Sequence, residues 1–292
     1  MQMGHGGGGR MARRLVERRI LPRFDNAALR SRHDGAVLEI GGGRWAFTAD
    51  GHVVQPLEFP GGGIGSLAVY GTANDLAMCG ARPAWMSASL ILEEGLGMEV
   101  LERVLESMAG AAREIGVEIV TGDTKVVDRG HGDGMYVSMS WMGPVVAPGV
   151  VAPATVREGD VVILSGDVGR HGMAILSVRE GIRFEGAPRS DCAPLVAPVL
   201  ELFAEGVEVH CLRDLTRGGL AAALDEIASA AGVGIEVDEG RVPVSEAVRG
   251  ACEVLGLDPI HVANEGRFVA FVPVGTDGLT PASRPLRLLV AQ

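Results

Sequence analysis

Strand-like and helix-like segments alternate from residue 36 onward, and this alternation limits the fold more than any other feature of the chain. Strand-like runs at Ala36–Ile40 and Trp45–Thr48 precede a long helical pattern at Ile64–Gly80. A second helical pattern, Met98–Ile115, places its apolar residues on one face. Interleaving of this kind is typical of an α/β (α+β) protein in which helices cover a sheet.

A Pro- and Gly-rich stretch, Pro144–Glu158, interrupts the alternation near the middle of the chain. The pattern then resumes, with a strand-like run at Val161–Leu164 and a helical one at Gly219–Ala230. We therefore predict an N-terminal domain at residues 31–150 and a C-terminal domain at residues 151–292. With 292 residues, of which 47% are hydrophobic, the chain can build both cores without disulfides or structural metal.

The charge is acidic overall but uneven along the chain. A formal net charge of −11 argues against a general nucleic-acid binder. Residues 1–30, by contrast, are Gly-rich at the start and carry seven arginines against two acidic residues. They predict a solvated basic helix or, alternatively, a docking segment for an acidic partner.

Cysteine usage and hydropathy indicate the compartment. The four cysteines show no C-x-x-C spacing, which argues against a zinc or redox motif, and scattered thiols fit a reducing environment. The first residues lack the apolar core of a signal peptide, and no stretch has the length and apolarity of a membrane span. We expect a cytoplasmic protein that binds neither nucleic acid nor membrane.

Lysine usage is the strongest functional signal. The chain contains 25 arginines and a single lysine, Lys125, which follows Asp123 and Thr124 at the end of a predicted strand. A lone lysine is best explained where a compact ammonium is needed, for example against a phosphate, because a guanidinium cannot replace it there. Chance survival of one surface lysine is the alternative.

Several aspartates lie beside predicted turns and strand ends. Asp50 ends a strand, Asp75 follows Asn74 in the first helical pattern, Asp123 precedes the lysine, and Asp34 precedes the first strand. Carboxylates gathered at strand ends, together with substrate phosphates, are what Mg²⁺ requires. Each aspartate taken singly is more often a turn former or a helix cap.

Two further positions have both a functional and a structural interpretation. Asp214 opens a Gly-rich turn before a helix, where backbone N–H groups can face an anion, although a simple N-cap explains it equally well. Glu265, between Asn264 and Gly266, precedes a strand and can act as a general base or merely form a turn. The seven histidines show no ligand spacing, and we interpret them as structural.

Eight short segments, in the same order as in the family, resemble HypE, a family of hydrogenase maturation proteins in the PurM-like superfamily of aminoimidazole ribonucleotide synthetase. The segments are His5–Arg10, Ala46–Asp50, Phe59–Gly65, Gly71–Met78, Leu92–Gly95, Thr121–Val127, Arg213–Leu220 and Asn264–Gly266. Their order from residue 5 to about residue 273 is specific, whereas each motif alone is weak.

The resemblance implies a two-domain PurM-like architecture, with a mixed N-terminal sheet backed by helices and a C-terminal α/β domain. It implies a homodimer that binds ATP and Mg²⁺. It also implies a carbamoyl dehydratase, which converts a thiocarboxamide on a C-terminal cysteine to the thiocyanate that supplies cyanide ligands of nickel–iron hydrogenases. The carbamoyltransferase HypF and the HypC–HypD complex are the implied partners.

Site residues carried over by motif fall into three roles. Lys125 and Glu265 are the implied catalytic residues. Asp50, Asp75 and Asp123 are the implied metal ligands. The nucleotide-binding residues are the same three aspartates together with Gly63, Asn74, Thr124 and Asp214. A different phosphoryl-transfer enzyme of the superfamily and a non-catalytic scaffold for maturation proteins are the two alternatives.

The sequence departs from the family pattern at two places. Ala49 stands where a threonine is usual before the aspartate, which is a minor change. The likeness also fades after Pro273: HypE chains end in a cysteine, whereas this sequence ends at Gln292 and its last cysteine is Cys252. We therefore expect the ATP site to be present and self-modification of a tail cysteine to be absent.

Overall fold

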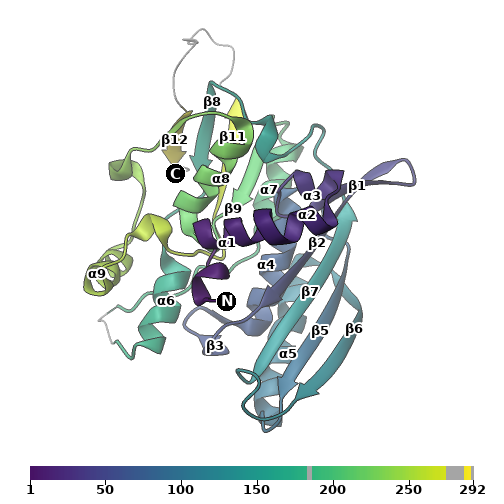
Figure 1. Ribbon diagram of the computed structural model, residues 1–292, viewed down its shortest axis with the longest axis vertical. Coiled ribbons are helices and arrows are strands. Elements are labelled where there is room, and N and C mark those ends of the chain that lie inside the picture. The colour runs from purple at the N-terminus through teal and green to yellow at the C-terminus, as the bar shows by residue number, and fades with distance from the viewer. Residues whose placement is uncertain (183–185, 274–285, 291–292) are drawn as a thin grey trace.

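The structure, a computed structural model, describes residues 1–182, residues 186–273 and the backbone of residues 286–290 (Figure 1). It contains two five-stranded mixed sheets and a two-stranded ribbon. This confirms the predicted α/β class with a helix-backed, mixed N-terminal sheet. Within the described residues no helix combines the length and apolarity that a membrane crossing requires.

The N-terminal sheet has the strand order β1-β2-β7-β5-β6. Its strands are β1 (Ala36–Ile40), β2 (Gly43–His52), β5 (Trp85–Glu93), β6 (Glu118–Val127) and β7 (Met135–Pro144). Only β5 and β6 run parallel, because α5 (Met98–Ile115) provides the crossover between them. Helices α4 (Ile64–Met78) and α5 lie on one face of the sheet (Figure 1). Among the described residues no helix covers the opposite face over β5 and β6, whereas the N-terminal helices border it at β1 and β2. We call this opposite face the uncovered face.

The C-terminal sheet has the order β10-β12-β8-β11-β9. Its strands are β8 (Asp160–Leu164), β9 (Cys211–Asp214), β10 (Ile235–Glu236), β11 (Phe268–Pro273) and β12 (Leu286–Val290). The helices of this half are α6 (Arg170–Arg179), α7 (Val196–Ala204), α8 (Gly219–Ala231) and α9 (Glu246–Leu255). The short ribbon pairs β3 (Glu58–Phe59) with β4 (Gly62–Gly63).

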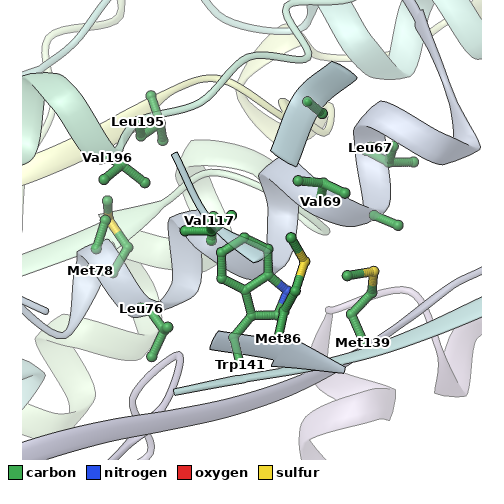
Figure 2. Close-up of a cluster of buried hydrophobic side chains, with 14 of the residues drawn as sticks. Leu67, Val69, Leu76, Met78, Met86, Val117, Met139, Trp141, Leu195 and Val196 are labelled. Atoms are coloured by element: carbon green, nitrogen blue, oxygen red, sulfur yellow. The ribbon is translucent and has the colours of Figure 1, made fainter. Parts of the chain in front are cut away.

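Helix α4 is buried on nearly all sides because it packs against both halves of the chain. It contacts β2 and β7 of the first sheet and also β9 and α7 of the second half. Figure 2 shows Trp141 of β7 between Leu76 of α4 and Met86 of β5, and Val196 from the second half next to Met78 of α4. One hydrophobic cluster therefore runs through both predicted domains.

The N-terminal segment crosses the second half as a chain of short helices (Figure 1). These are a 3₁₀ turn (Met3–His5), α1 (Arg10–Leu15), a π-helical turn (Val16–Ile20), α2 (Leu21–Phe24) and α3 (Ala27–Arg30). Arg13 of α1 donates to Asp225 and Ser229 of α8. The basic segment is thus helical, and part of its charge is matched by α8.

Candidate functional site

A cavity of about 550 Å³ lies between the two halves, where the end of β2, the middle of α4 and the start of α8 meet. Its lining is rich in carboxylates from distant parts of the chain. They are Asp34, Asp50, Asp75, Asp214, Glu226 and Glu265. Such a concentration of acidic groups needs a cation, a proton or both to be stable.

Three of these carboxylates form a compact cluster. One oxygen from each of Asp34, Asp75 and Asp214 lies within 4.8 Å of the other two. Asp75 comes from α4, Asp214 ends β9, and Asp34 precedes β1. Asp34 Oδ2 and Asp214 Oδ2 are buried and have no hydrogen-bond partner among the described residues. The cluster therefore presents free oxygen ligands at a single point, an arrangement that suits a hard divalent cation such as Mg²⁺.

Repulsion among the carboxylates of this cluster favours the binding of a cation. Burial, and then the charges of Asp214 and Asp34, raise the pKa of Asp75 well above its usual range. Burial, and then the charge of Asp34, raise the pKa of Asp214 in the same direction. Arg213 is the positive group nearest to the cluster, with Nε 3.0 Å from Asp34 Oδ1, but it is shared with Glu226. A bound divalent cation would offset the remaining repulsion.

The expected metal ligands are only partly brought together. Asp75 lies in the cluster, whereas Asp50 lines the cavity beside it, with Oδ1 accepting from Gly51 N at 2.7 Å. Asp34 and Asp214 complete the cluster instead. The reason is tertiary: Asp34 and Asp214 come from opposite halves of the chain, and β9 brings Asp214 against α4.

Asp123 and Lys125 lie on the opposite face of the N-terminal sheet from Asp50. In the ladder, Gly51 pairs with Ser138, Ser138 with Ser89, and Ser89 with Asp123. Side chains along a strand alternate between the two faces of a sheet. Asp123 therefore lies on the same, uncovered face as Gly51, and Asp50, the residue before Gly51, points to the other face.

The edge position of β6 also separates these two residues from the cavity within one chain. Strands β7 and β5 lie between β2 and β6. Lys125 and Asp123 are exposed and pair with each other, with Nζ 2.6 Å from Oδ2. Thr124 points to the helix side, where it lines a shallow groove with α5. The expectation that these residues and Asp50 meet at one edge of the sheet is therefore wrong for a single copy of the chain.

Gly63 and Asn74 occupy structural positions. Gly63 is the N-cap residue of α4 and pairs with Glu58 in the ribbon. Asn74 is buried, donates to the Ala193 carbonyl at 3.1 Å and accepts from Leu195 N at 2.7 Å. Neighbouring helix residues point about 100° apart, so Asn74 turns away from the cavity that Asp75 faces.

Glu265 reaches the cavity from the turn before β11. Burial, followed by the charges of Asp214 and Asp191, raises the pKa of its carboxyl well above the usual range. A side chain at Gly71 of α4 would place its Cβ 3.8 Å from Glu265 Oε2 and 3.2 Å from His52 Cε1. Because residue 71 is a glycine, space remains beside the Glu265 carboxylate. The burial of Glu265 and the raised pKa of its carboxyl suit a general base.

Several cavity residues were missed by the interpretation of the sequence, among them His52, His171 and Arg217. His52 lines the cavity, although the histidines were interpreted as structural. Burial lowers the pKa of His52, and its Nε2 lies 3.1 Å from Thr72 Oγ1, so a neutral imidazole faces the carboxylates. Its spacing of two from Asp50 on a strand was the available signal. Arg217, inside the Arg213–Leu220 motif, also lines the cavity.

A second, larger cavity of about 1230 Å³ adjoins the first. It lies between the N-terminal helices, β1, β2 and α8. Apolar residues contribute much of its wall, including Ala12, Val16, Leu29 and Phe47. Both cavities are lined by Gly8, Asp34, Ala49 and Glu226, so they meet at the acidic cluster.

Comparison with known families matches both halves of the chain to AIR synthase related proteins. Residues 32–145 match the N-terminal domain of that family and residues 157–279 match its C-terminal domain. The chain is 50% identical over 286 residues to carbamoyl dehydratase HypE of Cupriavidus necator, a match that covers 97% of this chain and 82% of that protein.

Solved structures agree with this assignment. The chain superposes on a HypE–HypF complex with a TM-score of 0.85 and 44% identity, covering 89% of this chain and 84% of that one. For HypE in complex with ATP the TM-score is 0.77 and the identity 46%, covering 93% of this chain and 81% of that one. Thiamine monophosphate kinase of Aquifex aeolicus, at 17% identity and a TM-score of 0.69, shares the fold alone.

Proposed function

The chain belongs to the HypE family of AIR synthase related proteins, and from that membership we propose that it is an ATP-dependent carbamoyl dehydratase. The reaction converts a thiocarboxamide to a thiocyanate, which supplies the cyanide ligands of nickel–iron hydrogenases. The observation that carries the proposal is that one cavity holds both a buried carboxyl of raised pKa, Glu265, and a cluster of three carboxylates suited to Mg²⁺.

The proposed reaction removes one oxygen and two protons from the carboxamide. The amide oxygen attacks the γ-phosphorus of ATP and ADP leaves, which turns that oxygen into part of a leaving group. The nitrogen loses one proton when the imidate forms and a second when the carbon–nitrogen triple bond forms and inorganic phosphate departs. We assign Glu265 as the acceptor of the proton that leaves as the nitrile forms, because it lines the cavity and burial raises the pKa of its carboxyl.

The two adjoining cavities suggest how ATP binds. The apolar walls of the larger cavity suit a nucleoside, and the acidic cluster at its junction with the smaller cavity suits phosphates carried with Mg²⁺. We place the Mg²⁺ on Asp34, Asp75 and Asp214, with Asp50 beside them. There the ion would neutralise phosphate charge and polarise the transferred phosphoryl group.

The direct test supplies the substrate in trans. The protein is incubated with ATP, Mg²⁺ and a short peptide ending in S-carbamoylcysteine, and the peptide is followed by mass spectrometry. We expect loss of one water molecule from the peptide, coupled to release of ADP and phosphate. ADP release with thiamine monophosphate but no change in the peptide would favour a different kinase of the superfamily. Absence of ATP binding in calorimetry would favour a scaffold.

We also propose that the protein works as a homodimer, formed through the uncovered face of the N-terminal sheet. Phe47 is 45% exposed there, and Trp85, 48% exposed, stacks on Trp45 with ring centroids 5.9 Å apart. Large apolar side chains exposed together usually mark an interface. Because Asp123 and Lys125 share this face, a second copy packed against it would bring them to the cavity of the first copy.

A subunit-mixing experiment tests this arrangement. We expect Lys125→Ala and Glu265→Gln each to be inactive alone in ATP-dependent nitrile formation. If Lys125 acts across the dimer, random exchange of subunits leaves about a quarter of all sites intact, since each mixed dimer has one site with both changes and one with neither. Activity should then return on mixing. If the mixture stays inactive although mixed dimers have formed, both residues serve the same site in one chain. Arg249→Ala, on α9, is the matched control for loss of a surface cation.

The partners follow the same proposal. A relative of this chain was solved as a HypE–HypF complex, and we propose a HypF-like carbamoyltransferase as the partner that loads the thiol. The HypC–HypD complex is the proposed acceptor of the cyanide group, on family resemblance alone.

A further inference from the structure

The segment of residues 190–195 joins Glu265, the proposed base, to helix α4, which carries Asp75 of the acidic cluster. It has no regular secondary structure, and it lies between α6 and α7 in the chain. Its polar groups nevertheless bond to three separate parts of the molecule: the ribbon at Pro60, helix α4 at Asn74, and the Glu265 turn. We call it the connecting segment.

Asp191 holds the Glu265 turn with both of its carboxylate oxygens. Oδ1 accepts from Glu265 N at 3.3 Å and Oδ2 accepts from Gly266 N at 3.1 Å. The Ala193 N–H adds a third bond, to the Glu265 carbonyl at 3.4 Å. The contact is close, because a Cβ at position 266 would lie 1.9 Å from the Asp191 carbonyl oxygen. The backbone on either side of the Glu265 side chain is thus fixed.

The other end of the connecting segment is fixed to α4. Asn74 donates to the Ala193 carbonyl and accepts from Leu195 N, while Ser190 N donates to the Pro60 carbonyl at 2.8 Å. Asn74 is the direct neighbour of Asp75 in the acidic cluster. Consecutive residues of one helix therefore determine the position of a cluster carboxylate and, through the connecting segment, the position of Glu265.

We propose that Asp191 is a positioning residue which, through its two backbone hydrogen bonds, holds Glu265 at a fixed distance from the acidic cluster. The proposal rests on the proposed role of Glu265 as the base. It also explains why residue 191 carries a carboxylate. A carboxylate accepts the two N–H bonds on separate oxygens, whereas an asparagine amide has a single accepting oxygen for both.

The cost of burying Asp191 supports a role beyond folding. Its side chain is 8% exposed, and no ion pair is recorded for it among the described residues. Burial raises the pKa of Asp191, while Arg267 and the two backbone N–H groups act in the opposite direction. A buried charge that makes only such bonds is costly, and a smaller neutral residue would fill the site at lower cost.

Asp191→Asn and Asp191→Ala provide the first test, in the peptide dehydration assay. Since a misplacement of about 1 Å can cost roughly a hundredfold in rate, we expect kcat to fall roughly a hundredfold for the alanine variant. The asparagine variant should fall less, because it keeps one of the two bonds. The KM for ATP should not change, because no atom of Asp191 lines either cavity. Equal losses in kcat and ATP affinity, or wild-type kcat in both variants, would overturn the proposal.

A second measurement does not depend on turnover. In hydrogen–deuterium exchange, we expect the Asp191→Asn change to speed exchange at the amides of Glu265 and Gly266 while the β11 amides keep their protection. Unchanged exchange at these two amides would overturn the proposal even if the alanine variant does not fold. Wild-type protein that forms no nitrile would instead remove the proposed dehydratase function, and the exchange result would still decide what Asp191 holds.

Asp238→Asn is the matched control. Asp238 is exposed and also accepts from a backbone amide, that of Gly240 at 3.0 Å. The same chemical change there removes one charge far from the cavity, and asparagine caps a turn about as well as aspartate. We expect wild-type kcat and exchange for this variant, which separates the effect of position 191 from the effect of losing an aspartate.

Discussion

The Glu265→Gln variant is expected to lose nitrile formation almost entirely while it continues to bind ATP. Removal of a positioned general base typically lowers a rate by roughly 10²–10⁴-fold. Glutamine has nearly the shape of glutamate, so it fills the space beside Gly71 and leaves the acidic cluster unchanged. The measurements are peptide dehydration for the rate and calorimetry for ATP binding.

Stability provides an internal check on this variant. Burial and neighbouring charges disfavour the ionised form of Glu265 in the folded protein. An acid whose pKa is raised on folding costs stability at a pH above its unfolded pKa, so replacement by a neutral amide should leave the melting temperature at neutral pH equal or higher. Glu253→Gln, at an exposed position on α9, is the control. Wild-type turnover by Glu265→Gln would rule out its assignment as the base.

The Asp214→Asn variant should show two effects of opposite sign. Without divalent cation it should be more stable than the wild type, because the buried Asp214, one of three mutually repelling carboxylates, has become neutral. With Mg²⁺ and ATP it should lose turnover and most of the added stability that the ligands give the wild type, because one oxygen ligand is weakened. Melting temperature measured with and without Mg²⁺·ATP gives both effects.

A surface substitution separates cluster charge from overall charge. Asp225→Asn, on α8, removes the same charge at an exposed position that, within the part of the chain described, is paired only with Arg13. Exposed pairs contribute little, roughly 0–1 kcal/mol, so we expect little change with or without Mg²⁺. If Asp214→Asn responds to Mg²⁺·ATP as the wild type does, Asp34, Asp75 and Asp214 do not form the metal site.

Periodicity in the sequence located the main helices and strands of the first half, although β2 runs from Gly43 to His52, well beyond the expected Trp45–Thr48. The helix at Met98–Ile115 and the strand at Ala36–Ile40 have the bounds that we expected. Helix α5 owes its pattern to one face packed against α4, which is what periodicity measures, whereas β1 is largely exposed. Helix α4 ends at Met78, two residues before the expected end at Gly80.

Tertiary pairing decided which acidic residues meet. Asp75 and Glu265 were expected at the site and line the cavity, whereas the partnership of Asp34 with Asp214 depends on how the two halves pack. For Asp123 and Lys125 the deciding quantity was strand register: a sheet with antiparallel neighbours places Asp50 and Asp123 on opposite faces, which spacing along the chain does not reveal. Asn74 was expected at the nucleotide, whereas its amide hydrogen-bonds to Ala193 and Leu195, which are long-range contacts that the sequence does not reveal.

The shared core around α4 limits how this protein can admit its substrates. A clamshell opening of the two halves would expose the side chains that run continuously from Trp141 to Leu195. We therefore expect entry to involve a segment outside this core. The glycine-rich arm, residues 1–9, contacts Arg217 through Gly8 and has no buried side chains of its own. We expect movement of this arm, and not a hinge motion between the two halves of the chain, to set the rate at which nucleotide exchanges.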